Sequence, residues 1–263
     1  MDLLDIGGID PVPGLYCVLE NEPEKAAAMA AAVKEMNFKT HIKIKLYGKH
    51  DLDKSIITAV RNVMGSDTYI VGDVNCGYRV TKSTEPLDEI ARLLLELHAV
   101  GLNACEDPAD MSIEQWVALQ KKVDTLDLIP DHIMRPAAAA VNTIVPGMGS
   151  IYNIHPGCMG SVIDAVRLAT KVKSFGAKLM IGDDSLIGPS LTAWQQVAIG
   201  TQAEWVEAVE KQGESEVFLE CVRSQVTFRD ANGNMAMKKP KPGFGQDIDV
   251  DAVRSKAVAS IVI

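Results

Sequence analysis

Thr40-His41-Ile42-Lys43-Ile44-Lys45-Leu46 is the stretch that decides the fold. Apolar and polar residues alternate along it. Because successive side chains of a strand point to opposite faces, the isoleucines lie on one face and the lysines on the other. An edge strand that exposes its lysines to water shows the same pattern. The acidic residues that end later segments favour a second interpretation, in which both lysines lie at the mouth of a barrel.

Strand-like and helix-like segments alternate along the chain, which is typical of βαβ units around a parallel sheet. The predicted strands are 15–19, 40–46, 68–72, 103–105, 133–134, 151–154 and 178–181, with a weaker eighth unit at 203–209. Helices are predicted at 23–36, 53–64, 85–100, from 112 onward, at 161–175 and at 189–200. We therefore expect an α/β fold of the TIM-type (β/α) barrel class. Residues 1–14 are expected to be a connector, 15–212 the barrel, and 213–263 an extended segment packed on the barrel.

Ionisable residues stand at the ends of most of these strands. They are Lys45, Asp73, Glu106, Arg135, His155 and Asp183, spaced 20 to 33 residues apart. In such a barrel the C-terminal ends of the strands converge on one mouth, where the active site lies. A barrel held together by packing alone does not need an ionisable group at nearly every strand end. The repetition therefore predicts a functional site.

Composition and charge limit the class of protein. The 263 residues match one barrel of about 250 residues. A net charge of −9 argues against nucleic acid or an anionic membrane surface as partner. No apolar run is long enough to span a membrane, and the N-terminus has no basic segment followed by an apolar one. The five scattered cysteines predict reduced thiols and a cytoplasmic location.

The ordered motifs resemble the barrel domain of the enolase superfamily, in particular the mandelate racemase and muconate lactonizing enzyme group. The matching segments are Lys43-Ile44-Lys45, Gly72-Asp73-Val74-Asn75, Cys105-Glu106-Asp107-Pro108, Asn153-Ile154-His155 with Gly160-Ser161, and Phe228-Arg229-Asp230 with Pro242-Gly243-Phe244-Gly245. The resemblance covers nearly the whole chain from about residue 15.

This resemblance implies removal of the α-proton of a small carboxylate substrate, with the enolate stabilised by Mg²⁺ or Mn²⁺. Lys45 would be the base and Lys43 would contact the substrate carboxylate. Asp73 and Glu106 would ligate the metal, because hard cations prefer oxygen ligands. Asn75, Arg135 and Asp184 are expected to contact the substrate.

The fifth strand departs from the group's pattern. The group has an acidic residue or an asparagine at its end, whereas Arg135 stands there in this chain. An arginine cannot ligate a cation, so the third metal ligand must come from elsewhere. Asp131 lies at the start of the predicted strand and should face the other end of the barrel. Asp107, next to Glu106, is the better candidate.

The sixth strand also departs from the pattern, because His155 replaces a lysine. A histidine serves as an acid or base near neutral pH. We predict that Asp183, at the end of the next strand, forms a dyad with it. Asp184 competes for the same inward position. The alternative is a histidine that is hydrogen-bonded at the rim and has no chemical role.

Together these features predict a lyase or isomerase, either a dehydratase or a racemase. Dehydration is favoured because His155 can protonate a departing hydroxide while Lys45 takes the α-proton. The alternative is a degenerate or truncated barrel without catalysis, since the group's N-terminal capping domain has no counterpart here. An uncapped apolar mouth would also favour a homo-oligomer.

Overall fold

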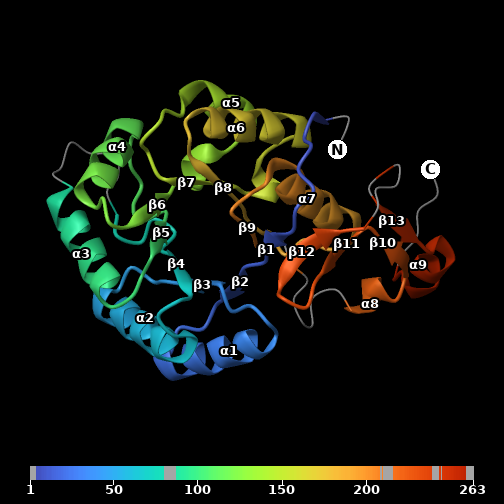
Figure 1. Ribbon diagram of the computed structural model, residues 1–263, viewed down its shortest axis with the longest axis horizontal. Coiled ribbons are helices and arrows are strands. Elements are labelled where there is room, and N and C mark those ends of the chain that lie inside the picture. The colour runs from blue at the N-terminus through green and yellow to red at the C-terminus, as the bar shows by residue number, and fades with distance from the viewer. Residues whose placement is uncertain are drawn as a thin grey trace.

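The computed structural model describes residues 4–79, 87–207, 209, 216–238, 243 and 245–258. Eight parallel strands lie within a ring of helices (Figure 1). The strands are β2 (Tyr16–Val18), β3 (His41–Lys45), β4 (Tyr69–Asp73), β5 (Ala104–Glu106), β6 (Asp127–Ile129), β7 (Ile151–Ile154), β8 (Lys178–Ile181) and β9 (Trp205–Val206). The helices are α1 (Pro23–Glu35), α2 (His50–Met64), α3 (Asp88–Ala99), α4 (Ile113–Lys122), α5 (Ala137–Thr143), α6 (Val162–Ser174) and α7 (Gly188–Thr201). The predicted TIM-type barrel is confirmed.

Two runs of parallel strands form the barrel wall. One run has the order β2-β3-β4-β5-β6 and the other has the order β7-β8-β9. At one seam the Asn153 N–H donates to the Pro130 carbonyl (3.1 Å). At the other seam the Leu15 N–H donates to the Val206 carbonyl (2.8 Å). These bonds close the eight strands into one barrel and bring their C-terminal ends to a common mouth.

The strands separate two apolar cores. Ile42 and Ile44 of β3 are fully buried in the larger core, which also contains apolar residues of the surrounding helices. A smaller cluster, apart from this one, consists of Leu15, Val71, Ala104, Ile129, Ile151, Met180 and Trp205. Because side chains alternate along a strand, these residues mark the inward face of the barrel. This inner layer supports the polar residues nearer the mouth.

The predicted fifth strand at 133–134 is wrong. The fifth strand of the barrel is β6, which pairs with β5 so that Ile129 lies opposite Glu106. Pro130 follows it, and His132–Met134 form one turn of 3₁₀ helix. Arg135 therefore does not end a strand. The chain after Ile129 already runs along the mouth, which changes the place of Asp131.

The C-terminal segment lies beside α7 (Figure 1). β1 (Val12–Pro13), β12 (Asn234–Met237) and β11 (Thr227–Arg229) form an antiparallel sheet, and β10 (Val222–Gln225) pairs with β13 (Gln246–Ile248). Two helices, α8 (Glu216–Leu219) and α9 (Val250–Lys256), accompany them. The segment expected to be extended from residue 213 therefore also contains helices. The domain boundaries at 14 and 212 stay predictions. The expected helix start at 85 and the motif residues 242 and 244 lie outside the described residues.

Candidate active site

Inward-facing residues follow a simple rule at the mouth. Lys45, Asp73, Glu106 and Ile129 are paired in register across four strands. Neighbours in register point to the same face, so the first three side chains converge above the inner apolar layer. The residue two positions beyond an inward one tends to face inward again. This rule accounts for most of the contacts described below.

Lys43 is surrounded by three carboxylates. Its Nζ lies 2.8 Å from Glu106 Oε2, 3.0 Å from Glu207 Oε2 and 3.2 Å from Asp73 Oδ2. We call these four residues the carboxylate cage. Burial by itself lowers the pKa of Lys43, but the three carboxylates raise it well above its ordinary value. Lys43 therefore carries its charge inside the cage.

Asp73 connects both lysines. Its Oδ2 is 2.8 Å from Lys45 Nζ, and its Oδ1 accepts hydrogen bonds from the backbone and side chain of Asn75. Although burial opposes ionisation, Lys43 and Lys45 lower the pKa of Asp73 to about 2. Asp73 is thus an ionised oxygen donor. Asn75 thus helps to orient Asp73, and its expected contact with substrate stays a prediction.

Glu106 lies where negative charges accumulate. Burial raises the pKa of Glu106 well above its ordinary value, and the charges of Asp73, Asp131 and Glu207 add to the increase, whereas Lys43 opposes it. Its Oε1 accepts a hydrogen bond from Asn153 Nδ2 (2.8 Å). Its Oε2 is buried and, among the described residues, accepts no well-aligned hydrogen bond despite its closeness to Lys43. The cage therefore holds more carboxylates than its cations neutralise.

Asp131 lies close enough to this group for its charge to raise the pKa of Glu106. Asp131 is buried two residues beyond the inward Ile129, and Arg135 pairs with its carboxylate. The expectation that Asp131 faces the other end of the barrel is wrong, because it rested on the misplaced fifth strand. Asp107 accepts the backbone N–H groups of Asp131 (3.0 Å) and His132 (2.9 Å). Its two oxygens thus hold the turn that presents Asp131.

His155 lies next to Asp184 and not next to Asp183. The His155 Nδ1 is 3.0 Å from Asp184 Oδ2. Asp183 Oδ1 accepts the N–H of Leu186 (3.3 Å). Met180 faces inward, so alternation brings Gly182 and then Asp184 to the inner side. The predicted His155–Asp183 dyad is wrong for this reason, and the competing residue Asp184 takes its place.

Two site residues were missed in the sequence. Glu207 follows β9, two residues after the inward Trp205, and Asn153 lies between the inward Ile151 and His155. Both contact cage residues, as described above. The signal for Glu207 was an acidic residue inside the predicted eighth unit at 203–209, but that unit was too weakly defined to show where its strand ends.

The residues at the mouth fit a magnesium ion. Asp73, Glu106 and Asp131 supply carboxylate oxygens from the ends of three consecutive strands, which is the ligand type that Mg²⁺ prefers. Glu106 Oε2 is a buried oxygen that has no aligned donor within the part of the chain that the structure describes. A divalent cation would neutralise the excess of carboxylates. These three residues are the ones that would hold it.

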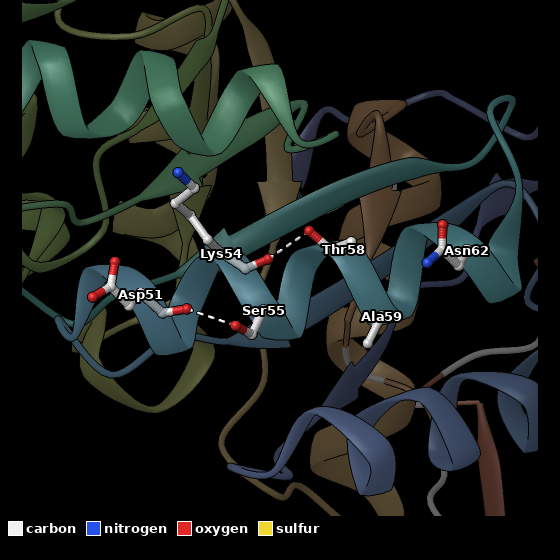
Figure 2. A pocket seen from close by; sticks show the side chains of 6 residues that line it. All are labelled: Asp51, Lys54, Ser55, Thr58, Ala59 and Asn62. Carbon is white, nitrogen blue, oxygen red and sulfur yellow. Dashed lines mark hydrogen bonds between the residues drawn. The ribbon is translucent and has the colours of Figure 1, made fainter.

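A hollow on the outer side of α2 is unrelated to this chemistry. It is lined by Asp51, Lys54, Ser55, Thr58, Ala59 and Asn62 (Figure 2). The hydroxyls of Ser55 and Thr58 donate to carbonyls of their own helix, four residues earlier. The hollow is a surface of one helix and contains none of the residues described above.

Comparison with known proteins identifies the class of this fold and site. A barrel whose strand ends carry a Lys-x-Lys pair and successive carboxylates belongs to the enolase type. The model of the "Enolase C-terminal domain-like" family matches residues 25–253. The chain belongs to this family. A search of curated proteins finds no match to the sequence.

Solved structures with the same fold come from several bacteria. A predicted mandelate racemase from Rhodobacter sphaeroides is 19% identical (TM-score 0.78), and the alignment covers 100% of this chain and 66% of that one. An N-succinyl Arg/Lys racemase from Bacillus cereus is 21% identical (TM-score 0.75), and the alignment covers 97% of this chain and 66% of that one. A dipeptide epimerase from Cytophaga hutchinsonii, complexed with Mg and the dipeptide D-Ala-L-Val, is 18% identical (TM-score 0.75). The alignment covers 97% of this chain and 66% of that one. The chain spans about two thirds of the length of these proteins.

The helices give no sign of a membrane span. Within the described ranges, none combines the length and the apolar character needed to cross a bilayer.

Proposed function

We propose that this chain is the barrel part of a magnesium-dependent isomerase that removes and returns the α-proton of a small carboxylate substrate. The observation that carries the proposal is that Asp73 and Glu106 surround Lys43 beside Lys45, with Asp131 near enough to raise the pKa of Glu106. Magnesium bound there would stabilise the negative charge that develops on the substrate carboxylate when its α-proton leaves.

The chain's own groups provide proton transfer from two sides of the barrel. Lys45 lies on β3 with about a quarter of its side chain exposed (29%), so its amine is accessible from the mouth. His155 follows β7, and its side chain is 15% exposed. Because the strands are arranged in a ring, these two groups face each other across the mouth. One base on each face of a substrate is the arrangement that racemisation requires.

Other residues of the mouth hold this pair in place. Lys43 is enclosed by its carboxylates and is less accessible than the sequence suggested, so its role is to keep positive charge below the substrate carboxylate. Asp184 lies beside His155 and would orient its ring. The names of the structural relatives favour an isomerase over the dehydratase that the sequence favoured. They also suggest N-succinyl amino acids and dipeptides as a first substrate panel.

Exchange of the α-proton tests the proposal without knowledge of the product. The protein with Mg²⁺ is incubated in D₂O with each enantiomer of the panel, and loss of the α-proton signal is followed by NMR. We expect Lys45→Gln to slow exchange of one enantiomer by about 10²–10⁴-fold and His155→Gln to slow exchange of the other. Lys54→Gln, on the outer face of α2, is the control and should change neither.

A non-catalytic barrel is the second candidate. The observation that favours it is that Lys43 and Lys45 both pair with Asp73, so ammonium groups already neutralise one expected metal ligand. Magnesium binding without exchange of any panel member would support this candidate. We also propose a cytoplasmic location, since Cys17, Cys76, Cys105 and Cys158 are free thiols.

Self-association is proposed from the apolar surface of the mouth. Leu19 follows β2, Ile163 lies in the first turn of α6 and Ile187 precedes α7, and their side chains are 65%, 53% and 41% exposed. Large exposed apolar side chains on one rim are typical of an interface. Sedimentation velocity should show a species larger than the monomer, and Leu19→Ser should shift the distribution towards the monomer.

A further inference from the structure

Three metal-ligand atoms meet beside the carboxylate cage without belonging to it. They come from His155, Cys158 and Asp184, and they lie within 4.8 Å of one another. A thiol, an imidazole and a carboxylate form a different donor set from the oxygen-only group of Asp73, Glu106 and Asp131. The two groups therefore select different cations.

The local backbone explains why His155 and Cys158 lie together. Residues Pro156–Cys158 form a turn of 3₁₀ helix, and the Cys158 N–H donates to the His155 carbonyl (3.2 Å). In such a turn, side chains three positions apart lie on the same side. The turn therefore brings the Cys158 sulfur back over the imidazole.

Gly157 lets Asp184 approach this turn. Its N–H donates to Asp184 Oδ2. A Cβ at position 157 would lie 2.2 Å from that same oxygen, so any side chain there would displace the carboxylate. The same oxygen is 3.0 Å from His155 Nδ1. The glycine thus makes the space that the third ligand occupies.

His155 Nδ1 is a buried nitrogen without an aligned hydrogen-bond partner among the described residues. Buried polar atoms are nearly always paired, and one that is not calls for a partner. Asp184 lies close enough for an ion pair but is not aligned for a hydrogen bond. A cation held between this nitrogen, the sulfur and the carboxylate would satisfy all three.

We propose that His155, Cys158 and Asp184 bind a divalent transition metal of the zinc type. Sulfur, imidazole nitrogen and carboxylate oxygen are the ligands that zinc takes, and three protein ligands leave a fourth position open. Ligand atoms around tetrahedral zinc lie about 3.3–3.8 Å apart. His155 Nδ1 and Asp184 Oδ2 are 3.0 Å apart and all three ligand atoms lie within 4.8 Å of one another, so small shifts place them around the ion.

Arg135 adjoins the proposed zinc site. Its Nη1 donates to Cys158 Sγ (3.6 Å), while its guanidinium pairs with Asp131. A hydrogen bond to a ligand atom from a neighbouring residue is the usual support of a metal site. The carboxylate of Asp131 offsets the positive charge of the Arg135 guanidinium. Metal on Nδ1 would occupy a nitrogen of His155, so a loaded zinc site and proton exchange at that nitrogen exclude each other.

Cobalt is the probe that tests this site. Co²⁺ bound to a thiolate gives a near-ultraviolet charge-transfer band, which oxygen and nitrogen ligands alone do not give. We expect the band to appear on titration with Co²⁺, to saturate near one ion per chain and to disappear on addition of Zn²⁺. Cys158→Ser should abolish it, and His155→Gln should weaken it. Gly157→Ala, which displaces Asp184, should lower the Co²⁺ affinity about 10–100-fold.

Two control variants distinguish the band of Co²⁺ bound at this site from a band of Co²⁺ bound at other residues. Cys76→Ser removes another partly exposed thiol near the mouth and should leave the band unchanged. Asp73→Asn removes a proposed magnesium ligand and should also leave it unchanged, so failure of the magnesium proposal is a separate result. A band that survives Cys158→Ser, or the lack of any band at millimolar Co²⁺ in the folded protein, would overturn the proposal.

Discussion

Asp131 and Asp107 lie next to each other at the mouth, and their surroundings give them different tasks. Asp107 accepts two backbone N–H groups, whereas Asp131 pairs with the partly exposed Arg135. An oxygen already engaged by the backbone is a poor ligand, and one held by a side chain that can move is a better one. Asp131 is therefore the third ligand that we propose.

Removing the charge of Asp131 should weaken magnesium binding. We expect Asp131→Asn to raise the Kd for Mg²⁺ by about tenfold or more, because affinity depends on the number of charged oxygen ligands. Isothermal titration calorimetry measures this. Asp124→Asn, an exposed acid before β6, is the matched control. Equal affinities in both variants would remove Asp131 from the metal site.

Asp107 should titrate near neutral pH. Burial and the charge of Asp131 raise the pKa of Asp107 to about 7 from an ordinary value of 3.8. Between these values the native state holds a proton that the unfolded chain has released. This group therefore makes the free energy of unfolding fall as pH rises from about 4 to 7.

Carboxyl ¹³C NMR measures this titration directly. Asp131→Asn should lower the pKa of Asp107, because it removes the neighbouring charge and keeps the backbone hydrogen bonds. A pKa near 3.8 in the unmodified protein would show that water reaches the carboxylate.

Among the elements, α4 has the most fully specified start. Ser112 accepts the Gln115 N–H (3.3 Å), and Gln115 Oε1 accepts the Ser112 N–H (2.9 Å). This reciprocal pair satisfies two N–H groups that the helix itself cannot. The sequence indicated this start from Ser112 with Glu114 nearby.

Loss of this cap should destabilise the protein modestly. We expect Ser112→Ala to lower the free energy of unfolding by about 1 kcal/mol, as measured by urea denaturation. Ser55→Ala is the control, since Ser55 is exposed in the middle of α2 and alanine favours a helix there. Similar losses of unfolding free energy in both variants would mean that the Ser112 cap does not stabilise the protein more than an exposed serine in the middle of a helix does.

At the scale of the whole molecule, the C-terminal segment is joined to the barrel through a buried polar contact. Thr227 Oγ1 of β11 donates to Gln195 Oε1 of α7 (2.6 Å), and both residues are buried. A buried pair of this kind stabilises the docked state, since separating the partners inside an apolar contact leaves an acceptor unsatisfied.

Breaking this contact should destabilise the whole chain. We expect Thr227→Val to cost about 1–3 kcal/mol, because the shape is kept and the hydrogen bond is lost. Thr170→Val, on the exposed face of α6, should change stability by less than about 0.5 kcal/mol. Thermal unfolding followed by calorimetry compares them. Two separate transitions in Thr227→Val would show that the tail and the barrel unfold independently.

The pattern of residues along the chain was enough to predict the barrel and half of its site. Alternation in β3 places Ile42 and Ile44 outside and the two lysines inside, and this depends only on backbone geometry. Asp73 and Glu106 follow because parallel strands of a barrel end at a common mouth. These local rules act within a few residues, so they can be read without the fold.

Pairing between distant segments decided where the other residues of the candidate site lie. β6 has three residues, too few for a periodic signal, and only its register with β5 shows that Asp131 lies at the mouth. The inward side of Met180 likewise selects Asp184 over Asp183, and closure of the ring brings Glu207 to Lys43 from 164 positions away. Such contacts depend on strand register and barrel closure, which are set by the packing of the whole chain and not by any short stretch of it.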